Sequence, residues 1–154
     1  MHKYYKNAEG QLFVDPILAN HVGLTEITKA QFDKTLADKN KPTTDQLLQR
    51  LTQSRKEQER QGVTINGIRY AGDPSNRQAI SEAMQFMADA EATEFPIWKD
   101  SDDVFHVDHP LIDVVDAYRA IGVRRVQLIA AEGQYAAQVV DGSLTEVTGL
   151  TWPQ

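Results

Sequence analysis

The sequence of 154 residues contains no cysteine, and this absence removes whole classes of chemistry. Without thiols there is no disulfide, no thiolate nucleophile, and no zinc or iron–sulfur site built on sulfur. No apolar run approaches the roughly 18 residues that a membrane-spanning helix needs. The first residues are also not followed by an apolar segment of signal-peptide length. The sequence therefore predicts a protein made in the cytoplasm, with no membrane partner.

Basic residues are outnumbered, with 16 Lys and Arg against 22 Asp and Glu, so that the formal net charge is −6. Such a charge repels phosphate backbones. The densest basic positions are Arg124-Arg125 and the run 55–60, and glutamates interrupt the run. We interpret both as solvated helix faces and expect no nucleic-acid partner.

Catalytic motifs are missing as well. The sequence has neither a Gly-x-Ser-x-Gly nucleophile elbow nor a Gly-x-x-x-x-Gly-Lys phosphate loop. Asp113 and Asp116 lie three residues apart, but acid–base catalysis also needs a pocket that perturbs one carboxyl group. Arg119 is placed to pair with Asp116 on an exposed face. We therefore expect no enzyme activity and no cofactor.

The alternative from another class is a small metal-binding or enzymatic domain that uses His106 and His109. Two imidazoles and the aspartate between them are suitable ligands for zinc or nickel. A spacing of three brings both rings to one face only in a helix, whereas the pattern predicts a strand followed by an N-cap at Asp108. The run Lys99 to Asp103 lacks the glycine and distal glutamate of a calcium loop. We favour a strand-to-helix junction and a hairpin turn, and expect no metal.

The predicted fold class is α+β, in three segments. Residues 1–38 form a small ββα appendage, with strands over 3–6, 11–14 and 25–27 and a helix that begins with the capping-box pair Thr28 and Gln31. Residues 39–62 form a linker and a polar helix. Since no residue from 52 to 61 is apolar, we expect that helix to be solvent-exposed or to span between modules.

Residues 63–154 form the third segment, with hairpins packed on two or three helices, one of them long. Asn66-Gly67 between β-prone runs predicts a type I′ hairpin, and Asp73 before Pro74 predicts the start of a helix. Strand-like runs at 95–98 and 104–107 predict a second hairpin. A helical pattern runs from 110 to 141. Because it contains Gly122 and Gly133, we expect either a bend or a close neighbour there.

Two stretches resemble families from bacteriophage tails. The stretch 63–153, with Gly67-Ile68-Arg69-Tyr70, Ile97-Trp98-Lys99, a long Ala/Val-rich helix and a terminal Leu-Thr-Trp-Pro, resembles an uncharacterised domain family of phage and prophage tail regions. The opening Tyr4-Tyr5-Lys6-Asn7 with Gly10 and Phe13, then Thr25-Glu26-Ile27-Thr28 and Gln31, resembles the front of phage tail-fibre assembly proteins.

This resemblance implies a non-enzymatic tail accessory protein that binds a tail-fibre or baseplate subunit and resides in the virion tail as a structural component. An alternative role is that of a tail-fibre assembly chaperone. The chain lacks the proline-rich middle segment of the assembly proteins, which favours the structural role.

The predicted partner-binding residues are apolar and lie near the two ends of the chain: Tyr4, Tyr5, Phe13, Leu150 and Trp152. Aromatic side chains give a large contact area at low entropic cost, which suits an interface. The competing interpretation is that they form the core of the appendage and a terminal strand. A homo-oligomer built on the long helix is a further possibility, although its glycines and irregular heptad spacing weaken a coiled-coil assignment.

Overall fold

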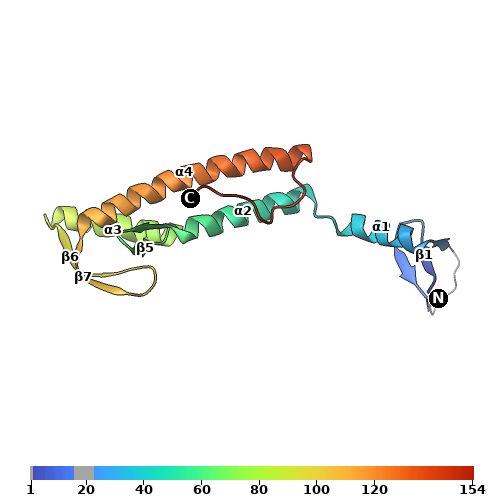
Figure 1. Cartoon of the computed structure of the whole chain (residues 1–154), viewed down its shortest axis with the longest axis horizontal. Coiled ribbons are helices and arrows are strands. Elements are labelled where there is room, and N and C mark those ends of the chain that lie inside the picture. Colours follow the sequence, from blue (N-terminus) through green and yellow to red (C-terminus); the bar gives the residue numbers. More distant parts are fainter. Residues whose placement is uncertain (1, 16–22) are drawn as a thin grey trace. The chain divides into compact units, whose positions relative to one another are not determined.

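The computed structural model describes residues 2–15 and 23–154 and confirms the α+β class (Figure 1). The chain divides into two compact units, Met1–Thr43 and Thr44–Gln154. The polar helix that the sequence analysis assigned to a linking segment thus lies within the second unit. No helix in the described ranges is both long and apolar enough to cross a bilayer.

The first unit is a three-stranded antiparallel sheet followed by a helix. The strands are β1 (Tyr4–Lys6), β2 (Leu12–Val14) and β3 (Thr25–Ile27), in the order β2-β1-β3, and the helix is α1 (Lys29–Asn40). Thr28 and Gln31 form the predicted capping box. The ring of Tyr4 on the central strand lies 4.9 Å from that of Phe32, so the sheet and the helix pack through aromatic contact.

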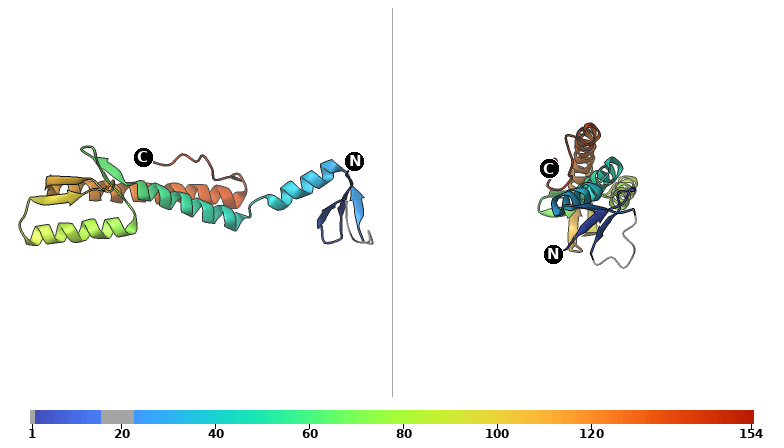
Figure 2. Two further views of the ribbon diagram at one scale, coloured as in Figure 1. Left: turned by 90° about the horizontal axis from the view of Figure 1, so that it is seen from below. Right: turned by 90° about the vertical axis from the view of Figure 1, so that its right-hand side faces the viewer.

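Three helices make up most of the second unit: α2 (Thr44–Gln61), α3 (Pro74–Asp89) and α4 (Leu111–Asp141). Helix α4 packs along α2 and also contacts α3 (Figures 1 and 2). It is continuous over 31 residues, a length of about 46 Å. A Cβ atom at Gly122 or Gly133 would meet nothing within 4 Å, so neither glycine has a close neighbour in the part of the chain that the structure describes.

Two antiparallel hairpins complete the second unit. Strands β4 (Val63–Ile65) and β5 (Ile68–Tyr70) are joined by Asn66 and Gly67, both at positive φ, which confirms the type I′ turn. Strands β6 (Glu94–Lys99) and β7 (Phe105–Pro110) form the other hairpin.

The prediction that Asp108 caps the long helix is wrong. Strand β7 continues past Asp108, because His109 pairs with Phe95 and Pro110 with Glu94. Pro110 is the N-cap of α4, without a side-chain hydrogen bond. Asp108 instead has a φ of 49°, which turns the strand opposite Pro96, a residue that cannot donate to the ladder.

The second unit has two hydrophobic clusters along α4. The larger one joins α3, α4 and the hairpins, and it buries Tyr70, Ile80, Met87, Phe95, Val114, Ala117 and Ile121. The smaller one joins α2, α4 and the C-terminal tail, and it buries Leu51, Leu128 and Trp152. Helix α4 therefore contributes to both clusters with one side of its surface.

The cap of α3 generates a testable pH dependence. Burial by itself raises the pKa of Asp73, but hydrogen bonds from Ser75 and Asn76 outweigh burial and lower the pKa to about 2. The D73A variant should lose about 1 kcal/mol of unfolding free energy at neutral pH. The difference from wild type should shrink between about pH 4 and pH 2, where the folded carboxylate becomes protonated.

Denaturant titrations of the two proteins across this pH range measure the effect. The matched control is D89A, which removes an exposed aspartate at the other end of the same helix. That variant should retain wild-type stability or gain slightly, because Asp89 lies at the negative end of the helix dipole. A D73A deficit that stays constant down to pH 2 would contradict the role of the ionised cap.

Candidate functional site

A cluster of charged side chains joins α2 to its neighbours. Glu59 is buried, and its carboxylate lies 2.5 Å from Arg55, 3.3 Å from Arg125 and 3.7 Å from Arg77. Arg55 also contacts Glu132 of α4 at 2.5 Å. Because ionised groups away from water require partners, these contacts fix the position of α2 against α4 and α3.

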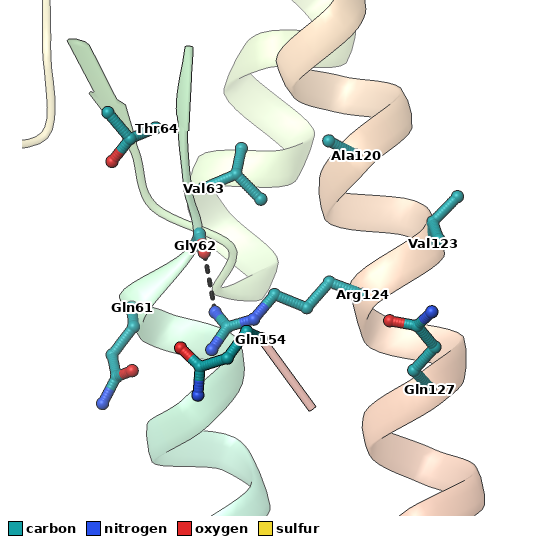
Figure 3. Close-up of a pocket in the computed structure, with 9 residues that line it drawn as sticks. All are labelled: Gln61, Gly62, Val63, Thr64, Ala120, Val123, Arg124, Gln127 and Gln154. Atoms are coloured by element: carbon teal, nitrogen blue, oxygen red, sulfur yellow. Dashed lines mark hydrogen bonds between the residues drawn. The ribbon is translucent and has the colours of Figure 1, made fainter. Parts of the chain in front are cut away.

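Arg124 enters the space between α4 and the C-terminal end of α2 (Figure 3). One of its guanidinium nitrogens donates to the carbonyl oxygens of Gln58 and Gly62, at 2.9 and 2.6 Å. A cation at this end of a helix interacts favourably with the unpaired carbonyl groups and with the helix dipole. Burial lowers the pKa of Arg124.

The chain turns sharply where Arg124 binds. Gly62 has a φ of 70°, and a Cβ atom there would collide with the carbonyl oxygen of Tyr70. Only glycine fits this combination of left-handed backbone and close packing. Arg124 and Gly62 line an open pocket of about 660 Å³ together with Gln61, Val63, Thr64, Ala120, Val123, Gln127 and Gln154.

These findings correct the interpretation as solvated helix faces for Arg55, Glu59 and Arg124, whereas Lys56, Glu57, Arg60 and Arg125 are exposed as predicted. Glu59 and Arg124 are buried, and the Arg55 side chain is only 12% exposed. Without apolar residues, the second half of α2 packs through ion pairs and through hydrogen bonds to its terminal carbonyls. Arg119 pairs with Asp116 on an exposed face, at 3.5 Å, as predicted.

The two candidate metal-binding histidines have different partners. His109 is buried, and its Nε2 atom shares a hydrogen bond of 2.7 Å with the hydroxyl of Tyr70. Its ring stacks on Trp98, with centroids 5.7 Å apart. Burial lowers the pKa of His109 and raises that of Tyr70 to about 12, so both groups are neutral at pH 7.

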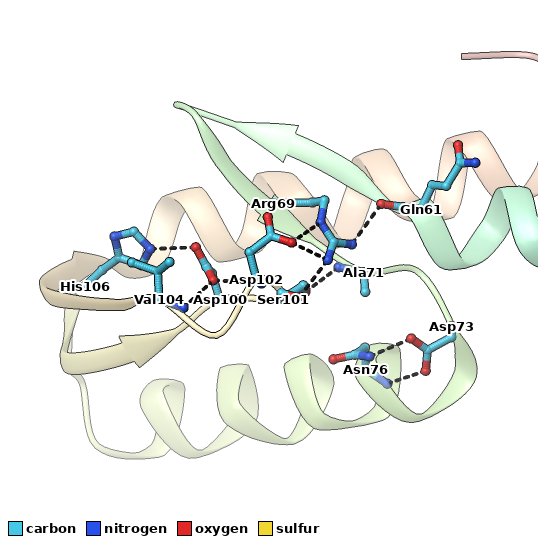
Figure 4. Close-up of polar contacts among 10 residues, drawn as sticks. All are labelled: Gln61, Arg69, Ala71, Asp73, Asn76, Asp100, Ser101, Asp102, Val104 and His106. Atoms are coloured by element: carbon cyan, nitrogen blue, oxygen red, sulfur yellow. Dashed lines mark hydrogen bonds and ion pairs between the residues drawn. The ribbon is translucent and has the colours of Figure 1, made fainter.

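His106 binds the loop that joins β6 to β7 (Figure 4). Its Nε2 lies 2.8 Å from a carboxylate oxygen of Asp100, and this hydrogen bond lowers the pKa of Asp100. The rings of His106 and His109 are 5.9 Å apart although the segment is a strand. The sequence argument that only a helix brings them together was wrong, because the positive φ at Asp108 interrupts the alternation.

The arrangement gives no support to the metal alternative. Both Nε2 atoms are engaged by protein groups. No group of three or more possible ligands from His, Cys, Asp or Glu occurs within residues 2–15 and 23–154. The run from Lys99 to Asp103 is the hairpin loop itself, in which Asp100 accepts hydrogen bonds from the backbone of Asp102 and Val104.

The same loop is held against β5 by Arg69 (Figure 4). The Arg69 guanidinium donates to Asp102 at 2.6 and 2.9 Å and to the carbonyl oxygen of Ser101 at 2.6 Å. The Ser101 hydroxyl accepts from the backbone of Ala71 at 2.7 Å. These contacts fix one hairpin on the other.

The β6–β7 hairpin carries an exposed apolar surface, which we call the hairpin face and define as Ile97, Phe105 and Val107. Ile97 and Val107 are cross-strand partners, and these three side chains are 62%, 67% and 74% exposed. Lys99 lies over the ring of Phe105, 5.8 Å from its centroid. Periodicity alone did not separate this face from the side that bears Phe95 and Trp98. Only the structure shows that the cross-strand partners Ile97 and Val107 are both exposed.

The residues predicted to bind a partner fall in two places. Tyr5 is buried in the first unit, and Tyr4 and Phe13 are half-buried there. In the second unit, Trp152 is buried against Leu51 and Leu128 and donates to Ser54 at 3.1 Å, while the half-buried Leu150 packs on this cluster. These positions fit the competing interpretation, in which the residues belong to small cores. Their role in partner binding stays a prediction.

The comparisons with known proteins identify a family whose function is unknown. Residues 42–149 match DUF4376, a domain of unknown function, and the chain belongs to this family. The matched range includes α2, which agrees with the extent of the second structural unit. No curated protein and no solved structure matches the chain.

The buried glutamate generates a stability prediction. The E59Q variant should lose about 3 kcal/mol of unfolding free energy, because Arg77 and Arg125 then lose the carboxylate that pairs with them and Arg55 keeps only Glu132. Chemical denaturation followed by circular dichroism measures the loss. E57Q is the matched control, since Glu57 is exposed on the same helix and should change stability by less than about 0.5 kcal/mol. Equal effects of the two variants would contradict the importance of the cluster.

Proposed function

We propose that this chain is a non-enzymatic bacteriophage tail accessory protein that binds a tail-fibre or baseplate subunit as a structural component of the virion. The single observation that carries the binding role is the hairpin face, three large apolar side chains presented to solvent on a paired strand. The assignment to a phage tail rests on the resemblance of the sequence, and the family of unknown function adds no role of its own.

Burial of the hairpin face would supply the binding energy. Fully burying a side chain such as Ile, Val or Phe is worth roughly 1.5–3 kcal/mol relative to leaving it exposed. The face is held in place by Arg69, Asp102 and the buried pair of Tyr70 and His109, so little conformational entropy is lost on binding. Shape complementarity, with no bond made or broken, is sufficient for this mechanism.

The role of assembly chaperone is the alternative within the same class. A virion component must be present in purified particles at a fixed ratio to the fibre or baseplate, whereas a chaperone that leaves after assembly is absent from them. Quantitative mass spectrometry of purified particles separates the two roles.

Binding can be tested by co-expression with the fibre and baseplate proteins encoded beside this chain. Wild type should co-elute with one of them in size-exclusion chromatography, where light scattering gives the mass of the complex. V107K should reduce the affinity for that protein at least tenfold, because a charge replaces an apolar contact. T64K is the matched control, since Thr64 is also an exposed β-branched strand residue but lies on the other hairpin. It should bind as wild type does.

Two outcomes would contradict the proposal. If wild type binds no neighbour-encoded tail protein, the tail accessory role is wrong. If wild type binds but V107K and T64K bind equally well, the hairpin face is not the interface, and Tyr4 and Phe13 of the first unit become the residues to truncate next.

A further inference from the structure

Helix α4 has a second apolar side that no described part of the chain covers. Its buried side carries Val114, Ala117, Ile121, Arg124, Leu128 and Val139. On the opposite side, at about 100° per residue, lie Val123, Val126, Ala130, Gly133, Ala137 and Val140. We call these six residues the outer face of α4. All are exposed, with Val126 at 67% and Val140 at 69%.

The spacing along the outer face alternates between three and four residues from Val123 to Val140. This average period of 3.5 is the heptad pattern of a helix that packs on another helix in a left-handed coiled coil. The heptad spacing of α4 is irregular only when its buried and exposed apolar residues are taken together. The structure separates the buried side from the exposed one, and the exposed side is regular.

The glycines of α4 are the second observation. Gly133 belongs to the outer face and Gly122 lies beside it, each at a cost of about 1 kcal/mol relative to alanine in a helix. A Cβ atom at either position would meet open space, so no contact within the described chain accounts for them. Glycine and alanine at the centre of the face allow the backbone of another helix to approach closely.

The charge pattern indicates which helix that is. Every exposed residue from 126 to 140 is uncharged: Val126, Gln127, Ile129, Ala130, Gly133, Gln134, Ala137, Gln138 and Val140. A face without charge meets no like-charge repulsion when it packs on itself. We propose that the outer face of α4 binds the outer face of a second copy of this chain, with the two helices antiparallel.

The antiparallel orientation follows from the charges at the ends of the face. With the twofold axis between residues 131 and 132, Val123 of one copy lies opposite Val140 of the other. Asp141 then lies near Arg119 of the second copy, and the pairing is repeated at the other end. Parallel helices in register would instead place Arg119 against Arg119. The antiparallel dimer therefore adds Asp141 to the pair of Asp116 and Arg119 at each end of the contact and avoids placing Arg119 against Arg119.

The mass of the purified full-length chain tests self-association independently of any tail partner. Light scattering over a concentration series should give twice the chain mass of 17.3 kDa. V126K should give the monomer mass with unchanged helix content, because it places two charges in the contact, each opposite Ala137 of the other copy. Q138K is the matched control, an exposed residue of the same helix about 120° away from Val126, and it should remain dimeric.

A substitution of Gly133 distinguishes a helix–helix interface from a free helix surface. G133Q should abolish the dimer yet raise the melting temperature of the monomer, because glutamine is the better helix former and needs no space that a monomer lacks. A wild-type chain that is monomeric at all concentrations, or a G133Q variant that remains dimeric, would overturn the proposal.

The orientation can be read from engineered cysteines, since the natural chain contains none. When V123C and V140C are mixed and oxidised, antiparallel packing should give the mixed disulfide between the two variants. Disulfides within each variant alone, V123C to V123C or V140C to V140C, would indicate parallel helices and overturn the proposed arrangement.

Discussion

The second unit depends on the charge on Glu59. Helix α2 has no apolar side chain beyond Leu51, so hydrophobic burial cannot hold its second half against α4. Arg55, Arg77 and Arg125 converge on this one carboxylate from three helices, and Arg124 closes the terminal carbonyls of α2. Because an uncompensated buried charge is costly, the buried carboxylate of Glu59 is stable only with these arginines in place.

Once α2 is fixed in this way, the remainder of the unit follows along α4. Helix α2 is followed by Gly62, whose left-handed backbone leads into the β4–β5 hairpin. At Gly62 the chain packs against the backbone of Tyr70. Tyr70 in turn binds His109 at the end of β7, and Arg69 binds the loop between β6 and β7, so the β6–β7 hairpin is held at both ends. The other two helices and both hairpins therefore pack on one side of α4, and the opposite side stays exposed (Figures 1 and 2).

The sequence predicted those parts of the fold that depend on local chemistry. Asn66-Gly67 and the capping residues Thr28 and Asp73 each act on neighbouring backbone atoms, so their effect can be predicted from the local sequence. The wrong predictions concern residues whose environment depends on distant parts of the chain. The contact of Glu59 with Arg125 and those of Arg124 with Gln58 and Gly62 each span more than 60 positions, and no local pattern distinguishes a buried ion pair from a solvated one.

The wrong prediction of Asp108 as a cap has both a local and a non-local cause. The residue type is common at helix starts, but the strand ladder with Phe95 and Glu94 continued past it. Strand pairing satisfied the backbone groups that a cap would otherwise serve, and the proline opposite left room for a positive φ. The consequence is that His106 and His109 both reach protein partners, and a pair that resembled a metal site in sequence instead fixes the hairpin.

The two exposed apolar surfaces differ in the partner that each accepts. The outer face of α4 is straight, uncharged and periodic, so it is complementary to itself. The hairpin face is short, and Lys99, which lies over the ring of Phe105, is paired with Asp103 at 2.5 Å. The longer outer face of α4 therefore suits a second copy better than the hairpin face does, and the hairpin face is left for a different protein. A dimer through α4 would leave both hairpin faces free, and it would present them to such a partner as a symmetric pair.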